Sequence, residues 1–190
     1  YDKGMRVPDD VTLLLCDDNW GNLRKLPSQE KRDRKGGYGI YYHYDYVGGP
    51  RNSKWINVSQ IQRTWEQMTL AYNYGVRKLW VVNVGDLKGQ EYPLSYFMDL
   101  AWNPEQSLEE MGNYTKNWVG KQLGENYTED VSKLLATYSK LNMSVSPELL
   151  DKDIEKQEEK NKENRNYTVL RARVCNKEYL IEMKEIEYVT

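Results

Sequence analysis

The sequence predicts an α/β fold that forms part of a (β/α)8 TIM-type barrel and is followed by a helical region and a C-terminal tail. Three short apolar runs, at residues 11–16, 38–42 and 78–82, each end in a cluster of polar side chains. A short apolar run that ends in this way is typical of a buried parallel strand. An amphipathic stretch lies between the second and third runs, so we expect a β-α-β unit with a right-handed crossover, in which the third strand covers residues 76–82.

The stretch at residues 59–74 is the clearest predicted helix. Ile61, Trp65, Met68 and Tyr72 recur at spacings of three and four residues and make one apolar stripe. Gly75 follows at the position where a glycine commonly ends a helix. The preceding charged segment, residues 21–37, is expected to be a solvated loop or a short helix.

The second half of the chain is predicted to be mainly helical. We expect a short amphipathic helix at residues 95–102 and a mostly helical segment at 106–141, with breaks at Gly112, Gly120 and Gly124. A charged linker and a possible β-hairpin follow. The domain prediction is therefore a partial barrel at 1–104, a helical region at 105–150 and the linker and hairpin tail at 151–190. A closed barrel takes about 250 residues, so the 190-residue chain is expected to be an excerpt or a processed product.

Composition excludes several classes of function. The formal net charge of −2 argues against a nucleic-acid partner, and no apolar run is long enough to span a membrane. The single histidine, His43, and the distant cysteines Cys16 and Cys175 argue against a structural zinc site, and no cofactor motif is present. The 16 tyrosines and 6 tryptophans, against one phenylalanine, suit carbohydrate contact as well as ordinary packing.

The polar cluster after the first run contains the candidate catalytic residues. Asp17 and Asp18 are consecutive, so they point in opposite directions if strand geometry persists. A carboxylate that faces a pocket can act as a general acid or base. The alternative is a turn or a helix cap, which Asp17, Asp18 and Asn19 would equally favour.

The other two strand ends supply candidates for substrate binding. His43 shares a strand face with Tyr41 and Asp45, which suits a hydrogen-bonding wall for a polyhydroxylated ligand, although a lone histidine is more often structural. Asn83 follows the third run and can bond a substrate hydroxyl. The alternative for this strand end is a βα loop in which Asp86 caps the next helix. The remaining candidates are Trp20, Arg24, Tyr42, Tyr46, Asp86 and Lys88.

Carboxylates, amides and aromatic side chains at strand ends favour glycoside hydrolysis by paired acids. No phosphate-binding loop or dinucleotide fingerprint occurs, and the lone histidine belongs to no recognisable Ser/His/Asp set. The alternatives are a non-catalytic carbohydrate-binding remnant and a degraded product without function.

Three ordered motifs together resemble glycoside hydrolase family 115. They are Asp17-Asp18-Asn19-Trp20-Gly21, the segment from Gly36 to His43, and the segment from Trp80 to Lys88. Shorter supporting matches are Gly48-Gly49-Pro50, Trp65-Glu66-Gln67-Met68 and Asp99-Leu100-Ala101-Trp102. The resemblance extends from residue 1 to about residue 150, and the tail beyond it diverges.

The resemblance implies a xylan α-1,2-glucuronidase that removes glucuronic acid or its 4-O-methyl ether with inversion and without a cofactor. It implies a (β/α)8-barrel domain within a larger multidomain protein, secreted or periplasmic. The partners would be glucuronoxylan or its oligosaccharides and the rest of a larger chain or a second copy, with no nucleic acid or membrane. By motif position, the glucuronate pocket would be lined by Asp17, Asp18, Asn19, His43 and Asn83. Which acid protonates the leaving oxygen and which activates water stays open.

Overall fold

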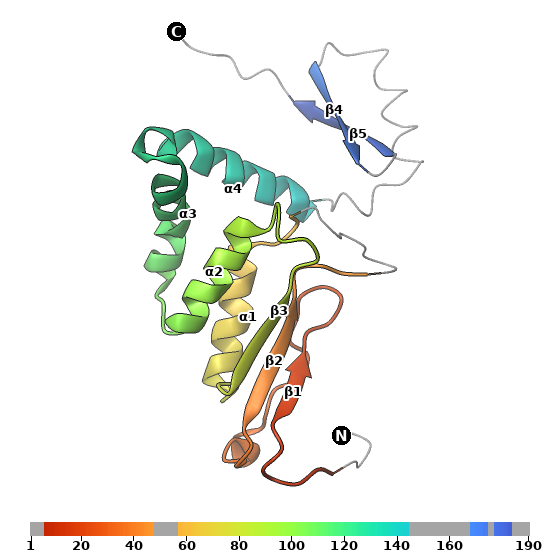
Figure 1. The fold of residues 1–190 in the computed structure, drawn as a ribbon, viewed down its shortest axis with the longest axis vertical. Coiled ribbons are helices and arrows are strands. Elements are labelled where there is room, and N and C mark those ends of the chain that lie inside the picture. Colours follow the sequence, from red (N-terminus) through yellow and green to blue (C-terminus); the bar gives the residue numbers. More distant parts are fainter. Residues whose placement is uncertain (1–5, 48–56, 145–167, 175–176, 184–190) are drawn as a thin grey trace. The chain divides into compact units, whose positions relative to one another are not determined.

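The computed structural model describes residues 6–47, 57–144, 168–174 and 177–183. The chain forms two compact units, Tyr1–Leu149 and Leu150–Thr190. The first unit contains a parallel sheet and the helices α1 to α4, and the second contains an antiparallel strand pair (Figure 1).

A small parallel sheet carries the strand ends that the sequence predicts. Its order is β1-β2-β3, and both neighbouring pairs are parallel. The strands are β1 (Leu13–Cys16), β2 (Tyr38–His43) and β3 (Leu79–Asn83). The three predicted strands are thereby confirmed, although β3 begins later than residue 76. Val76 still belongs to the turn after α1, because its N–H donates to the carbonyl of Ala71 at 3.0 Å.

The two faces of this sheet have different surroundings. Tyr38, Ile40 and Tyr42 lie on one face, are at most 4% exposed, and join side chains of α1 and α2 in the core. Alternation along the strands puts Leu14, Tyr41 and Val81 on the opposite face. Leu14 is 52% exposed, so this second face, which we call the open face, is uncovered in the described part of the chain.

The helix α1 (Ile61–Asn73) confirms the predicted helix at 59–74. Ile61, Met68 and Ala71 are buried along its apolar stripe. The next helix, α2 (Glu91–Trp102), begins four residues before the predicted start at residue 95. Pro93 lies in its first turn, where a missing backbone N–H costs no helical hydrogen bond.

The predicted helical segment at 106–141 contains α3 (Leu108–Leu123) and α4 (Thr128–Ser144), separated by a short 3-10 helix at Glu125–Tyr127. The break at Gly124 is confirmed, because its φ of 100° is one that glycine adopts readily. The breaks expected at Gly112 and Gly120 are wrong, since α3 runs through both. A capping box formed by Ser107 and Glu110 starts this helix. Its stabilisation helps to offset the low helix propensity of the two glycines. No helix in the described ranges is long and apolar enough to cross a membrane.

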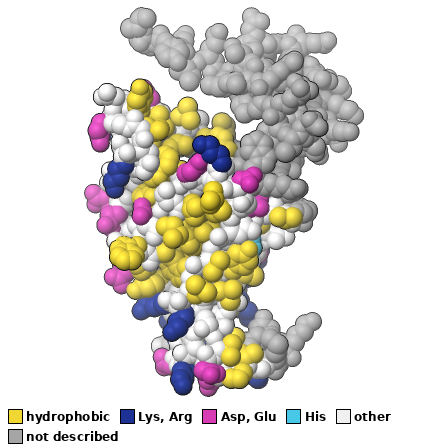
Figure 2. Space-filling model, viewed as in Figure 1, with side chains coloured by type: hydrophobic (Ala, Val, Ile, Leu, Met, Phe, Trp, Pro, Cys, Tyr) yellow, Lys and Arg dark blue, Asp and Glu magenta, His cyan; other side chains and the backbone are white. Residues whose placement is uncertain are grey.

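The space-filling view shows hydrophobic side chains gathered across the region where α2 and β3 lie (Figure 2). Leu79 of β3 is 50% exposed, and Met98 of α2 is also exposed. The outer edges of β1 and β3 have no strand partner among the described residues. An apolar parallel sheet with open edges is a surface that proteins usually cover.

The second unit contains β4 (Thr168–Val174) and β5 (Lys177–Met183). They pair antiparallel, with Thr168 opposite Met183 and Val174 opposite Lys177, in the region of the predicted hairpin. The predicted charged linker at 151–166 lies outside the described residues. The domain boundaries at 104 and 150 stay predictions.

Candidate active site

The carboxyl ends of the three strands meet at one edge of the sheet. β2 ends at His43, which lies opposite Asn83 at the end of β3. β1 ends at Cys16, opposite Tyr41, so Asp17 is the next residue toward the same edge. The register therefore brings together one candidate side chain from each predicted strand end, as ligand sites in parallel α/β folds require.

Asp17 is enclosed by donors from the end of β2 and the loop after it. Its side chain is fully buried, and its Oδ1 lies 2.5 Å from the Nδ1 of His43. Its Oδ2 accepts hydrogen bonds from the hydroxyl of Tyr46 at 3.1 Å and from the backbone N–H of His43 at 3.3 Å. Burial raises the pKa of Asp17 above its ordinary value of 3.8, although the contacts with His43 and Tyr46 oppose the rise.

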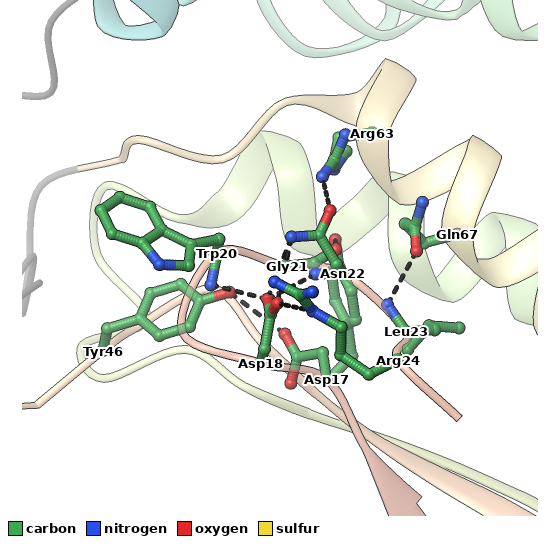
Figure 3. A network of polar contacts seen from close by, with 11 residues as sticks. Asp17, Asp18, Trp20, Gly21, Asn22, Leu23, Arg24, Tyr46, Arg63 and Gln67 are labelled. Atoms are coloured by element: carbon green, nitrogen blue, oxygen red, sulfur yellow. Dashed lines mark hydrogen bonds and ion pairs between the residues drawn. The ribbon is translucent and has the colours of Figure 1, made fainter. Parts of the chain in front are cut away.

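Asp18 organises the loop that follows β1 (Figure 3). Its Oδ1 accepts the backbone N–H groups of Trp20 and Asn22 at 2.8 and 2.9 Å. Its Oδ2 accepts hydrogen bonds from the Nδ2 of Asn22 at 3.1 Å and from the Nε of Arg24 at 2.5 Å. Partial burial alone would raise the pKa of Asp18, but these donors hold it well below its usual range.

The loop after β1 is also fastened to α1. The side chain of Arg63 bonds the Oδ1 of Asn22, and the backbone N–H of Leu23 donates to the Oε1 of Gln67 at 2.9 Å (Figure 3). Gln67 is itself buried in the helix face that meets the sheet. The position of the Asp18 loop is therefore set both by its own turn and by the adjacent helix.

Asn83 joins the ends of β3 and β2. Its backbone carbonyl accepts the N–H of Tyr44 at 2.9 Å, and its side-chain Oδ1 accepts the N–H of Asp45 at 3.1 Å. The side-chain oxygen of Asn83 thus adds one hydrogen bond between the two chain segments beyond the last paired residues of β2 and β3. The Nδ2 group of Asn83 is the part of this side chain that can donate to a ligand.

The other candidates near β1 lie in three different settings. Trp20 is 47% exposed, whereas Tyr46 is buried and only 8% exposed. Asn19 is exposed and so is Arg24, which pairs with Asp18. Tyr42 lies on the helix-covered face, where it is buried and its hydroxyl donates to the carbonyl of Gly21 at 3.3 Å. Its observed role is to support the loop from the core side.

The candidates after β3 lie apart from this cluster. Asp86 is exposed, and Lys88 is almost fully exposed and lies 3.7 Å from Glu91 at the start of α2. Among the described residues, no hydrogen bond or ion pair joins Asp86 or Lys88 to Asp17, Asp18 or His43.

Comparison with known proteins agrees with this geometry. A family model for glycosyl hydrolase family 115 matches residues 1–149, which is most of the chain. The chain belongs to glycoside hydrolase family 115. A solved structure from this family, BtGH115A, has 38% sequence identity and a TM-score of 0.74 over 78% of this chain. It is described as a 4-O-methyl-α-glucuronidase with specificity for decorated arabinogalactans.

This family 115 chain spans 20% of the length of that solved structure. A search of curated proteins found no match. The similar part is the mixed α/β unit that carries the strand-end cluster, with its small parallel sheet and its helices.

Three residues of the site were not predicted from the sequence, namely Asn22, Arg63 and Gln67. Asn22 lies four residues after Asp18, and an Asp-x-x-x-Asn spacing within a polar loop is a usable, though weak, signal for a side-chain-capped turn. Arg63 and Gln67 lie on α1, and only the packing of that helix beside the loop brings them to it.

Proposed function

We propose that this chain forms part of an α-glucuronidase that removes glucuronic acid, or its 4-O-methyl ether, from side chains of a polysaccharide. Membership in family 115 supports this proposal, as does the description of the similar structure as a 4-O-methyl-α-glucuronidase. That enzyme is described as specific for decorated arabinogalactans. Glucuronoxylan and glucuronate-decorated arabinogalactan are therefore the two substrates to compare.

One observation carries the proposal, namely the meeting of Asp17, His43 and Asn83 at a single edge of the sheet. A carboxylate, an imidazole and an amide can together donate and accept hydrogen bonds around a sugar ring. Trp20, which is 47% exposed, adds aromatic surface on the loop that follows β1 (Figure 3). Rings of this kind pack against the C–H faces of sugars while polar groups bond the hydroxyls.

The proposed chemistry is inverting hydrolysis by an acid and a base. Asp17 and Asp18 have pKa values displaced in opposite directions, because burial dominates at Asp17 and hydrogen-bond donors dominate at Asp18. An inverting pair is separated by about 6.5–9.5 Å, with room for the attacking water. Direct proton transfer from Asp17 to a substrate would require its carboxyl to leave His43 and Tyr46, because both its oxygens are engaged.

We propose that the sheet is a section of a (β/α)8 barrel and that the open face is the barrel interior. Leu14 and Leu79 on that face are each about half exposed, and parallel sheets are normally covered on both faces. Further strands of a larger chain would bury these side chains and pair the edges of β1 and β3. A second copy of the chain is the alternative cover.

The second candidate function is uronate binding without catalysis. The engagement of both carboxylates in hydrogen bonds within the protein favours binding without catalysis. Asp18 accepts hydrogen bonds from Trp20, Asn22 and Arg24, and the Asp17 side chain is fully buried. A site of this kind would hold the sugar but leave the glycosidic bond intact.

A thermal-shift measurement tests binding, with 4-O-methylglucuronate as the ligand and glucose as the control sugar. A ligand at about 100 times its Kd stabilises the native state by about 2.7 kcal/mol, so the melting temperature should rise with the uronate alone. Trp20→Ala should abolish the rise. Trp102→Ala is the matched control, since Trp102 is also an exposed tryptophan but lies at the end of α2. A rise that survives Trp20→Ala contradicts the site assignment.

Incubation with a glucuronoxylo-oligosaccharide separates hydrolysis from binding. Released 4-O-methylglucuronic acid supports the enzyme, whereas a thermal shift without release supports the binding module. The absence of both outcomes argues against each function for this chain.

A further inference from the structure

His43 is the only histidine in the 190-residue chain, and three neighbours fix its ring at the end of β2. Asp17 lies 2.5 Å from its Nδ1, and the rings of Tyr41 and Tyr46 have centroids 4.4 and 5.7 Å from that of the imidazole. The Tyr46 ring is nearly parallel to it, at 29°. The side chain of His43 nevertheless remains 24% exposed, whereas that of Asp17 is fully buried.

The imidazole thus has one nitrogen that contacts Asp17 and one that remains available. Nδ1 faces Asp17, and no hydrogen bond to Nε2 occurs within the described part of the chain. Alternation along β2 places His43 on the open face together with Tyr41. His43 is therefore better placed than Asp17 to touch a ligand at this strand end.

We propose that Asp17 is a positioning residue that keeps a proton on Nδ1 of His43, so that Nε2 accepts a hydrogen bond from a hydroxyl group of the bound uronic sugar. An ionised carboxylate only accepts hydrogen bonds, so the nitrogen that faces it must carry the hydrogen. In a neutral imidazole the other nitrogen is then an acceptor. The ligand half of this inference rests on the proposed function.

The hydroxyl of Tyr46 and the backbone N–H of His43 determine how the Asp17 carboxylate is oriented. Both donate to Oδ2, which therefore must be an acceptor, and Oδ1 is left for the imidazole. This arrangement gives Asp17→Asn a specific consequence. The amide oxygen will occupy the Oδ2 position, so the NH₂ group will face Nδ1. Nδ1 must then accept, and the proton moves to Nε2.

The experiment is ¹⁵N NMR of the full chain labelled at histidine, recorded at about pH 8, where an imidazole is ordinarily neutral. One histidine gives one unambiguous set of ring signals. We expect the Nδ1–H tautomer in the native chain and the Nε2–H tautomer in Asp17→Asn. Asp18→Asn is the matched control and should leave the tautomer unchanged, because Asp18 bonds Trp20, Asn22 and Arg24 instead. A thermal melt of each variant establishes that it is folded.

Adding 4-O-methylglucuronate tests the second half of the inference. We expect the Nε2 signal to shift and the affinity of Asp17→Asn to fall about 10-fold or more, as when an acceptor is replaced by a donor. Tyr46→Phe should weaken the tautomer preference without reversing it, which provides a second variant if Asp17→Asn unfolds.

The outcomes distinguish the two proposals. An Nε2–H tautomer in the native chain, or an unchanged tautomer in folded Asp17→Asn, overturns the positioning role of Asp17. Uronate binding without a shift of Nε2 overturns the contact with the sugar hydroxyl and leaves the proposed function standing. The expected tautomers without any uronate binding overturn the proposed function and the sugar contact, and support the positioning role alone.

Discussion

Asp17 and Asp18 are consecutive in the chain, but their carboxylates lie in opposite surroundings. Asp17 turns into the protein, where its oxygens contact one imidazole, one phenol and one backbone amide. Asp18 turns into its own loop, where backbone amides and the side chains of Asn22 and Arg24 donate to it. Burial has the larger effect on the pKa of Asp17, and the several hydrogen-bond donors have the larger effect on the pKa of Asp18. The two pKa values therefore move apart.

The comparison teaches that the two residues have separable structural tasks. Asp17 links β1 to the end of β2, whereas Asp18 closes the turn after β1. Either task can support a sugar site without the carboxylate touching the sugar. Substitutions that act on one residue and spare the other will test this division.

Removal of the Asp17 carboxylate should have the largest effect. Asp17→Ala should lower the free energy of unfolding by about 3 kcal/mol, because it leaves a cavity and removes the acceptor of the buried Tyr46 hydroxyl. Urea unfolding at pH 7 measures the loss. Asp17→Asn, which preserves the volume and one acceptor oxygen, is the control and should lose less. Equal losses in the two variants would contradict the assigned hydrogen bonds.

Removal of the Asp18 carboxylate should cost about 2 kcal/mol, since its partners lie nearer to water and can be partly rehydrated. Asp18→Ala should lower the free energy of unfolding of the whole chain and also loosen the loop after β1. Hydrogen exchange at the backbone amides of Trp20 and Asn22 should accelerate in Asp18→Ala, because Asp18 is their acceptor. In Asp17→Asn the same two amides should keep their protection. If both variants expose these amides equally, the two carboxylates act as one unit.

The pH dependence of stability should have opposite signs at the two positions. A carboxyl whose folded pKa is raised binds more protons in the native state, so the Asp17 contribution falls as pH rises above about 3.8. A carboxyl whose folded pKa is lowered stabilises the fold above about 3.8, and that contribution is lost as pH falls below it.

Urea unfolding between pH 3 and pH 7 measures both differences. The stability of the native chain relative to Asp17→Asn should decrease with rising pH, and its stability relative to Asp18→Asn should increase. Curves that run parallel for the two variants would show that the surroundings of the carboxylates do not differ in the way described.

The elements that the sequence predicted well are those with local signals. The strands and α1 follow from apolar runs and from a period of three to four residues, and Gly124 ends α3 through its own backbone conformation. Gly112 and Gly120 misled the prediction, because helix propensity is a weak term that the capped and packed α3 overrides.

The site was predictable in part for the same reason. The strand ends locate Asp17, His43 and Asn83, because parallel strands bring their carboxyl ends to one edge. The burial of Tyr42 also agrees with strand alternation, which gives it the same face as Ile40. The ties from Arg63 and Gln67 to the loop depend on where α1 packs, and residues more than 40 positions apart leave no local pattern of such a contact.

The smallest effect in the comparison is expected at Arg24. Its Nε lies 2.5 Å from Asp18, but its side chain is 73% exposed, and exposed ion pairs contribute about 0.2–1 kcal/mol. Arg24→Ala should therefore lower the free energy of unfolding by about 0.5 kcal/mol at most, and added salt should reduce the difference further. Asp18 retains its bonds from Trp20 and Asn22 in this variant, so their amides should stay protected.

Arg24→Lys separates the charge of this residue from its geometry. Lysine keeps the positive charge but lacks the planar guanidinium, so it should recover most of the small loss if the interaction is a screened ion pair. A loss in Arg24→Ala as large as that of Asp18→Ala would mean that the arginine, rather than the backbone amides, holds the carboxylate in place. The turn after β1 would then depend on a surface charge, and ligands that carry a carboxylate would compete with Asp18 for Arg24.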